Sequence, residues 1–149
     1  MNSIHSVLAQ DHQTCDGMFA ETEVAVGRAD FAAARSEFAR FREAMERHIS
    51  AEENIVFPAF EAKTGDRSGP TEIMRSEHQM MRDLFVKMDA ALTQQQAKQY
   101  LGLSETLLML LQQHNIKEEN ILYPMIDQAL GPEQQTILAK LQATGIGRT

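Results

Sequence analysis

Hydrophobic positions recur along this chain every three or four residues, which is the spacing of one face of an α-helix. Four stretches show the pattern: residues 3 to about 26, 30 to 62, 70 to 93 and 97 to 130. Alternation of polar and apolar residues with a period of two, the mark of a half-buried strand, is almost absent. The sequence therefore predicts an all-α protein.

Local signals divide the helical stretches from one another. Gly27 ends the first, and Asp30 is a good N-cap for the second. The segment KTGDRSGPTE separates the second from the third and places Pro70 in a first helical turn. A glutamine-rich link leads to the fourth stretch, which the Gly131-Pro132 pair closes; a short polar extra helix is expected before the C-terminal GIGRT. Four long helices with short links predict an up-down-up-down four-helix bundle, with residues 1–149 as one domain.

The two halves of the chain repeat each other. HISAEENIVFP at residues 48–58 returns as HNIKEENILYP at residues 114–124, a shift of 66 residues. The same shift brings Asp11-His12 onto Glu77-His78. The halves, about 3–62 and 69–130, are therefore expected to be two copies of one helical hairpin, packed around a pseudo-twofold axis.

Each repeat carries a histidine four residues before a glutamate, so both side chains of a pair lie on one helix face. That face is apolar and therefore inward. On the second helix it consists of Phe38, Phe41, Met45, His48, Glu52 and Ile55, and on the fourth it includes Leu107, Leu111, His114, Glu118 and Ile121. A histidine on the first helix and one on the third reach the same level of the bundle. Six polar side chains are thus predicted to converge on one layer: His12, His48, Glu52, His78, His114 and Glu118.

Such a layer needs a cation. A buried, unpaired carboxylate loses several kcal/mol of solvation, and two facing carboxylates repel each other. No lysine or arginine lies on the inner stripes to neutralise them. Imidazole and carboxylate together suit iron, manganese or zinc. A lone inward histidine is usually a core residue, but four with duplicated spacing predict a symmetric dinuclear site, in which each metal takes two histidines and a share of both glutamates.

Several neighbouring residues allow more than one interpretation. Glu53 and Glu119 fall about 100° round the helix from the pairs and are expected to be solvated. Cys15 is either a redox neighbour of the metals or, the favoured interpretation, a small buried hydrophobic residue. Asp16 lies four residues after a predicted ligand, but its repeat partner is Arg82, which speaks against ligation.

Three further residues bear on the geometry of the predicted site. His5 lies too far along its helix to share the centre. Pro58 and Pro124 interrupt helical patterns. They either end the helices or fix how the ligand-bearing turn leans inward.

Composition narrows the partners. The chain has 149 residues, 43% of them hydrophobic, enough for a full core. Lysine and arginine total 14 against 21 acidic residues, a net charge of −7 with no basic run, so nucleic acid and anionic membranes are poor partners. A single cysteine fits a reducing compartment. With no signal-peptide pattern and no apolar run near ~20 residues, the expected location is cytoplasmic.

The doubled His-xxx-Glu, followed by Glu-Asn, an aliphatic pair, an aromatic residue and proline, resembles the hemerythrin family in its HHE cation-binding branch. The resemblance covers residues 3–130. It implies a left-turning bundle and a non-haem di-iron centre with the six ligands named above, bridged by the two carboxylates and an oxo or hydroxo group. Two iron ions are the implied cofactor, with zinc, manganese or nickel as substitutes. The implied partner is a small ligand: O2, NO or peroxide.

Two departures bear on function. Oxygen-carrying members have a fifth histidine where this chain has Arg82, and their last motif is His-xxxx-Asp. Both weaken an interpretation as an oxygen carrier. The sequence leaves open a protein that binds or senses O2 or NO, a di-iron enzyme of oxidase, peroxidase or NO-reductase type, an iron-handling or repair protein, and a redox-silent structural site. It does not predict the oligomeric state.

Overall fold

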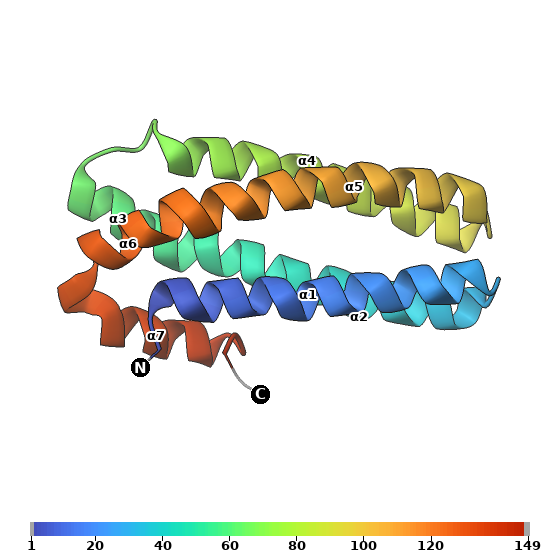
Figure 1. Ribbon diagram of the computed structural model, residues 1–149, viewed down its shortest axis with the longest axis horizontal. Coiled ribbons are helices and arrows are strands. Elements are labelled where there is room, and N and C mark those ends of the chain that lie inside the picture. Colours follow the sequence, from blue (N-terminus) through green and yellow to red (C-terminus); the bar gives the residue numbers. More distant parts are fainter. Residues whose placement is uncertain (1, 148–149) are drawn as a thin grey trace.

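The computed structural model describes residues 2–147, and four antiparallel rods dominate it (Figure 1). The first rod is α1 (Ile4–Gly27) and the third is α4 (Pro70–Thr93). The second joins α2 (Phe31–Ala51), a π-helical turn η1 (Glu52–Val56) and α3 (Phe57–Thr64). The fourth joins α5 (Ala97–Lys117), a π-helical turn η2 (Glu118–Leu122) and α6 (Tyr123–Ala129). The described residues contain no strand, so the predicted all-α bundle is confirmed.

The predicted helix ends are also confirmed. Asp30 Oδ1 accepts a hydrogen bond from the backbone N–H of Ala33 at 3.1 Å, and Pro70 is the first residue of α4. The links between α1 and α2 and between α4 and α5 each contain one non-glycine residue in the left-handed region, Ala29 and Gln95, both with φ 57°. These two residues are repeat partners. The duplication therefore extends to the backbone of the links.

The prolines neither end nor break their rods. Pro58 and Pro124 are the second residues of α3 and α6, directly after the π-helical turns. A proline inside an α-helix clashes with the carbonyl one turn earlier, and the wider π turn makes room for it. The extra residue also shifts the inner face by one position. Val56 and Leu122 are buried in place of the predicted Ile55 and Ile121, and Ile121 is 57% exposed.

The extra helix α7 (Gln134–Ala143) follows a 3-10 turn η3 (Gly131–Glu133) and runs beside the start of α1 at one end of the bundle (Figure 1). It was expected to be polar. Instead Ile137, Leu138 and Leu141 are buried, because they cover the end of the core. The helix α7 is therefore amphipathic and not polar throughout.

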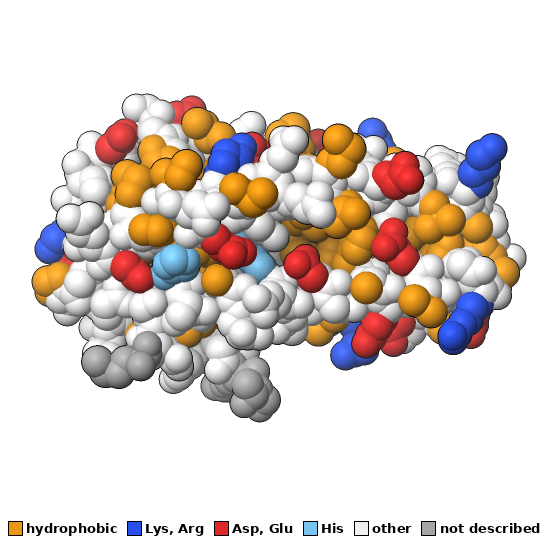
Figure 2. All heavy atoms as spheres, viewed as in Figure 1, with side chains coloured by type: hydrophobic (Ala, Val, Ile, Leu, Met, Phe, Trp, Pro, Cys, Tyr) orange, Lys and Arg blue, Asp and Glu red, His pale blue; other side chains and the backbone are white. Residues whose placement is uncertain are grey.

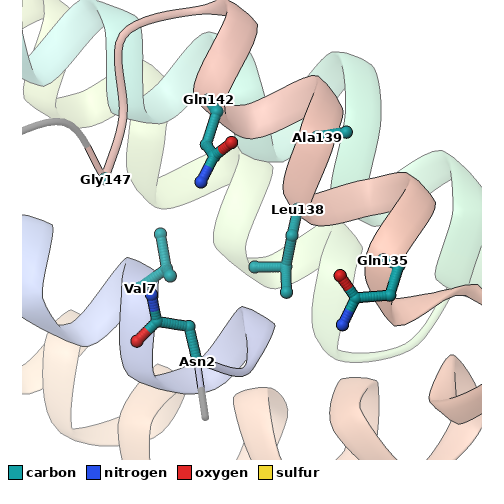
Figure 3. A pocket seen from close by; sticks show the side chains of 7 residues that line it. All are labelled: Asn2, Val7, Gln135, Leu138, Ala139, Gln142 and Gly147. Atoms are coloured by element: carbon teal, nitrogen blue, oxygen red, sulfur yellow. The ribbon is translucent and has the colours of Figure 1, made fainter.

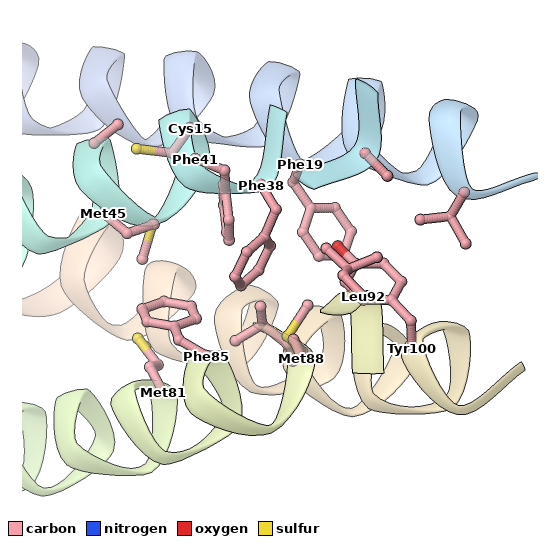
Figure 4. Packing of buried hydrophobic residues seen from close by; sticks show 14 of the residues in the cluster. Cys15, Phe19, Phe38, Phe41, Met45, Met81, Phe85, Met88, Leu92 and Tyr100 are labelled. Carbon is pink, nitrogen blue, oxygen red and sulfur yellow. The ribbon is translucent and has the colours of Figure 1, made fainter. Parts of the chain in front are cut away.

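The hydrophobic core falls into two clusters. One fills the end near the two left-handed links, where Phe41 packs edge-on against Phe85 with ring centroids 5.7 Å apart (Figure 4). The other lies under α3, α6 and α7 and includes Leu8, Val56 and Ile126. The predicted polar layer lies between them along every rod. No helix within residues 2–147 is long and apolar enough to cross a membrane.

Candidate metal centre

The structure brings all six predicted residues together in the layer between the two core clusters. Each of the six residues is buried, with no more than 6% of its surface exposed. Four rods each supply one histidine, and each π-helical turn begins with one of the glutamates. Single π turns inside α-helices are frequent at functional sites.

The two glutamates lie between two pairs of histidines. Glu118 Oε1 is 3.1 Å from His12 Nε2 and 3.1 Å from His114 Nε2. Glu52 presents one oxygen to each pair: Oε1 lies 3.0 Å from His78 Nε2, and Oε2 lies 3.6 Å from His48 Nε2. Potential ligand atoms therefore form two groups, each within 4.8 Å, one containing Glu52, His78, His114 and Glu118 and the other His12, His48 and Glu118.

Every one of these histidines also contacts a carboxylate on its outer side. The Nδ1–O distances are 2.7 Å for His12 and Glu119, 2.8 Å for His48 and Asp11, 2.9 Å for His78 and Glu53, and 2.8 Å for His114 and Glu77. Such a partner fixes the ring and leaves Nε2 pointing inward, the arrangement of metal-binding histidines.

Glu53 and Glu119 are therefore not plain solvated residues, as expected from their position round the helix. Each follows an inner glutamate and reaches across to a histidine of the other hairpin. The signal was present in the sequence: an acidic residue precedes His12 and His78 and another follows Glu52 and Glu118, so all four outer carboxylates belong to the repeat.

The inner contacts are ones that a cation would satisfy. A neutral imidazole has one N–H, and when Nδ1–H donates to the outer carboxylate, Nε2 is an acceptor facing a carboxylate that is also an acceptor. His78 Nε2 and Glu52 Oε1 lie 3.0 Å apart, yet neither forms a hydrogen bond. Glu118 Oε2 is likewise buried without a partner. The residues present therefore fit a bound metal.

In the metal-free protein, protons on the histidines offset the negative charge of the carboxylates. Burial disfavours a charged His48, but the carboxylates of Glu52 and Asp11 outweigh it and hold the pKa of His48 well above its usual value. Burial is likewise outweighed at His78, where Glu52 and Glu53 raise the pKa to about 9. The reverse holds for Glu52, whose pKa lies well below its usual value despite burial because His48 pairs with it.

The carboxylates around the layer outnumber the cations that pair with them. Two inner and four outer carboxylates surround the four histidines. Arg82 pairs with Glu53 at 3.0 Å and Lys117 pairs with Glu77; these are the cations bound to them within the described residues. Because Arg82 also pairs with Glu46, at least four of the six carboxylates have no full cationic partner among the described residues, an excess of negative charge that bound cations would offset.

Tyr123 joins the six predicted residues, and sequence reasoning missed it. Its fully buried hydroxyl lies 2.6 Å from Glu52 Oε2, 2.9 Å from Glu118 Oε1 and 3.1 Å from His12 Nε2. Burial and both carboxylates hold the pKa of this phenol well above its usual value. In the sequence motif, position 123 is simply the aromatic residue before the proline. The one sign that it differs from a core residue is that its repeat partner, Phe57, has no hydroxyl.

The layer therefore has two unlike sides. We call His12, His48 and Tyr123, with the outer carboxylates of Asp11 and Glu119, the tyrosine side. We call His78, His114 and Phe57, with the outer carboxylates of Glu53 and Glu77, the phenylalanine side. On the latter, the Phe57 ring stacks on His78 at an interplanar angle of 6° and a centroid distance of 6.0 Å.

The neighbouring residues whose role the sequence left open lie outside the two groups of potential ligand atoms. Cys15 is buried in the core, and burial beside Asp11 raises the pKa of its thiol to about 12, as befits a packing residue. Asp16 is exposed, and His5 lies beyond Tyr123 with ring centroids 5.8 Å apart. Arg82 contacts Glu46 and Glu53 and so stands outside the ligand layer.

A narrow cavity of about 10 Å³ adjoins the layer. It is lined by His12, Cys15, Asp16, Met45, Ile49, Met81, Leu111, His114 and Asn115. A second pocket lies between α7 and the start of α1 (Figure 3). Its lining has no titratable side chain and consists of Asn2, Val7, Gln135, Leu138, Ala139, Gln142 and Gly147. The first cavity alone of these two offers metal chemistry.

A four-helix bundle with histidines and carboxylates converging from all four rods defines a class of metal-binding bundle proteins. A sequence model of the hemerythrin HHE cation-binding domain matches residues 3–126. The chain belongs to the hemerythrin HHE cation-binding family. Neither the curated proteins nor the solved structures contain a match to it.

Proposed function

We propose that this protein carries a dinuclear non-haem iron centre that binds a small gaseous ligand, O2 or NO. The proposed metal ligands are His12, His48, Glu52, His78, His114 and Glu118. The observation that carries the proposal is the position of the two glutamates. Glu118 Oε1 is equally distant from one histidine of each side, and the two oxygens of Glu52 face opposite sides. Carboxylates in that position are shared by two ions.

The donor set supports iron as the metal. Imidazole and carboxylate ligands suit iron, manganese and zinc, and the family is described by cation binding. Iron, when bound, supplies the electrons and the open coordination positions that O2 and NO require. The chain's own residues orient the donors: each outer carboxylate holds one imidazole with Nε2 inward.

The cavity beside the layer supports a small ligand. A space of about 10 Å³ has room for one molecule the size of water. Met45, Ile49 and Met81 give it an apolar wall that does not hold water by hydrogen bonds, while Asp16 and Asn115 stand towards the surface. A space this small favours a small ligand such as O2 or NO over a larger substrate.

A second candidate is a di-iron enzyme that reduces peroxide or NO. It is favoured by the phenylalanine side, where Glu52, His78, His114 and Glu118 are the donors and Arg82 is engaged with Glu46 and Glu53. Four protein donors leave room for a substrate. Turnover would separate this candidate from reversible binding.

The test is metal analysis of protein purified without oxygen, followed by spectra with O2 and NO. We expect about two irons per chain and charge-transfer bands that change when either gas is added. A matched pair of variants, Glu118→Ala in the layer and Glu105→Ala on the exposed face of α5, controls for the loss of a carboxylate. Two irons retained in the Glu118 variant, or a redox-silent metal in protein from its own host, would contradict the proposal.

A further inference from the structure

Among the positions at which the two repeats differ, one lies inside the ligand layer and two place a charge next to its outer carboxylates. Tyr123 stands where the repeat has Phe57, Arg82 stands where it has Asp16, and Lys117 stands where it has Ala51. All three differences alter charge or donors close to the six candidate ligands. Pseudo-twofold symmetry of the backbone therefore does not extend to the electrostatics of the layer.

The phenol oxygen of Tyr123 has the spacing of a ligand. Donors bound to one ion at about 2.1 Å and near right angles lie about 3 Å from one another. Tyr123 Oη lies 3.1 Å from His12 Nε2, 3.3 Å from His48 Nε2 and 2.9 Å from Glu118 Oε1. It thus completes a set of donors around the tyrosine side. Tyr100, the second tyrosine of the chain, is buried in the distal core without a hydrogen-bond partner for its hydroxyl.

The phenylalanine side has no such oxygen. The Phe57 ring stacks on His78, and the guanidinium carbon of Arg75 lies 5.5 Å from the centroid of the same Phe57 ring. Glu61 in turn holds Arg75 in place. This side is therefore walled by an apolar ring with a cation behind it, where the tyrosine side presents a donor.

The outer carboxylates differ in the same direction. Glu53 is paired with Arg82 and Glu77 with Lys117 on the phenylalanine side. Among the described residues, no arginine or lysine forms an ion pair with Asp11 or Glu119 on the tyrosine side. On the face viewed in Figure 2, the histidine side chains that reach the surface are flanked by acidic side chains. A carboxylate without a cationic partner makes its imidazole a stronger donor.

We propose that the two metal positions are unequal, with Tyr123 as an additional ligand on the tyrosine side, which holds the ion of higher charge. On binding, the phenol loses its proton to solvent and its oxygen forms the bond to the metal. When the centre carries one ferric and one ferrous ion, the ferric ion occupies the tyrosine side. This inference rests on the proposed dinuclear function and assigns each half its own role.

The first test uses the two tyrosines as a matched pair. Iron is counted, and the oxidised protein is then examined by visible absorption and resonance Raman spectroscopy for phenolate-to-iron charge transfer and ring modes. We expect the signal in the wild type and in Tyr100→Phe and its complete loss in Tyr123→Phe. The affinity of Tyr123→Phe for ferric iron should fall roughly 10–100-fold. Persistence of the signal in Tyr123→Phe, or its absence from a wild type with two irons, overturns the proposal.

The second test compares the reduction potentials of the two ions. Reductive titration with a one-electron reductant should show two distinct steps in the wild type. The separation should shrink in Tyr123→Phe, which removes an anionic donor from one side, and in Arg82→Gln, which removes a cation from the other. Arg40→Gln, which breaks a surface pair with Glu37, is the control. A single two-electron step in the wild type, or a separation that neither variant changes, overturns the unequal charges.

These outcomes are distinct from failure of the dinuclear function. A wild type with one iron that still loses its phenolate signal in Tyr123→Phe would keep the tyrosine ligand and overturn the pairing of unequal ions together with the dinuclear function. Two irons without any phenolate signal would leave the function intact and overturn the tyrosine ligand.

Discussion

The tyrosine side and the phenylalanine side share a backbone and differ in chemistry. Both have two histidines from adjacent rods, a π-helical turn that begins with a glutamate, and two outer carboxylates. One side adds a phenol, and within residues 2–147 its outer carboxylates form no ion pair with lysine or arginine; the other side adds a phenyl ring and pairs its outer carboxylates with Arg82 and Lys117. The comparison teaches that a duplicated hairpin can keep its geometry while substitutions at a few positions give the two sides of the layer different electrostatics.

Removal of either inner glutamate should empty both sides of the layer and so remove the difference between them. Glu52→Ala or Glu118→Ala takes a donor from both sides at once, so metal content should fall from about two per chain towards zero. Removal of one histidine, in His12→Ala or His114→Ala, should weaken one side by at least 10–100-fold and leave the other occupied. Elemental analysis after dialysis measures both. Equal losses from a histidine and a glutamate variant would show that the glutamates are not shared.

The metal-free protein should respond to pH through its histidines. The pKa of His78 is raised to about 9 in the folded protein, against an ordinary value of 6.5. The raised pKa stabilises the fold fully below pH 6.5, and this contribution, about 3 kcal/mol for His78, is lost as pH rises through 9. Thermal or denaturant unfolding of metal-free protein at pH 6 and pH 9 measures it.

Metal should reverse the sign of that response, because the ligand histidines must lose their inner protons to bind. The loaded protein should therefore gain stability from pH 6 to pH 8. A metal-free protein whose stability rises over the same interval would contradict the charged histidine layer.

Loss of an outer carboxylate should have a smaller effect that differs between the sides. Glu53→Gln and Glu119→Gln should each weaken metal binding roughly 10–100-fold at the side whose histidine they hold. We expect the Glu53 variant to retain more of its metal affinity than the Glu119 variant, because Arg82 keeps Glu46 as a partner. Competition with a chelator measures the ratio. Unchanged metal affinity in both variants would instead support the interpretation of Glu53 and Glu119 as plain solvated residues.

The smallest expected effect lies away from both sides. Gly65 ends α3 with φ 74°, and a Cβ there would meet no atom within 4 Å. Gly65→Ala should therefore cost about 1 kcal/mol of unfolding free energy through backbone strain alone. Denaturant unfolding measures the loss, and metal content should stay unchanged. A change in metal content would show that the end of α3 is coupled to the layer.

The sequence sufficed for the rods and the inner layer because both depend on periodicity. Four-residue spacing places His48 with Glu52 on any α-helix, and the repeat transfers the same geometry to the second half. Periodicity failed where the backbone departs from 3.6 residues per turn. The π-helical turns move Ile121 to the surface and direct Tyr123 into the layer, and nothing in a helical pattern signals a π turn except the proline after it.

The contacts between the two hairpins could not be predicted from the sequence for a different reason. Glu119 bonds to His12 and Glu53 to His78, partners that are remote in sequence and lie on the other hairpin. A single-helix projection places both glutamates away from their own inward stripe, and only the packing of two rods shows that this direction is a neighbour's histidine. The polar appearance of α7 misled similarly, since three buried residues suffice to cover the end of the core.

The segment between α3 and α4 joins the hairpins by exposed residues at Asp66, Arg67 and Ser68. Each hairpin contributes two histidines and one inner glutamate to the layer, and each outer carboxylate of the π turns contacts a histidine of the opposite hairpin. A chain cut at this segment would consequently yield two fragments, neither with a complete centre. Their association would depend on the metal as well as on the hydrophobic core that the two hairpins share, so a bound ion would link the two fragments where the covalent segment no longer does.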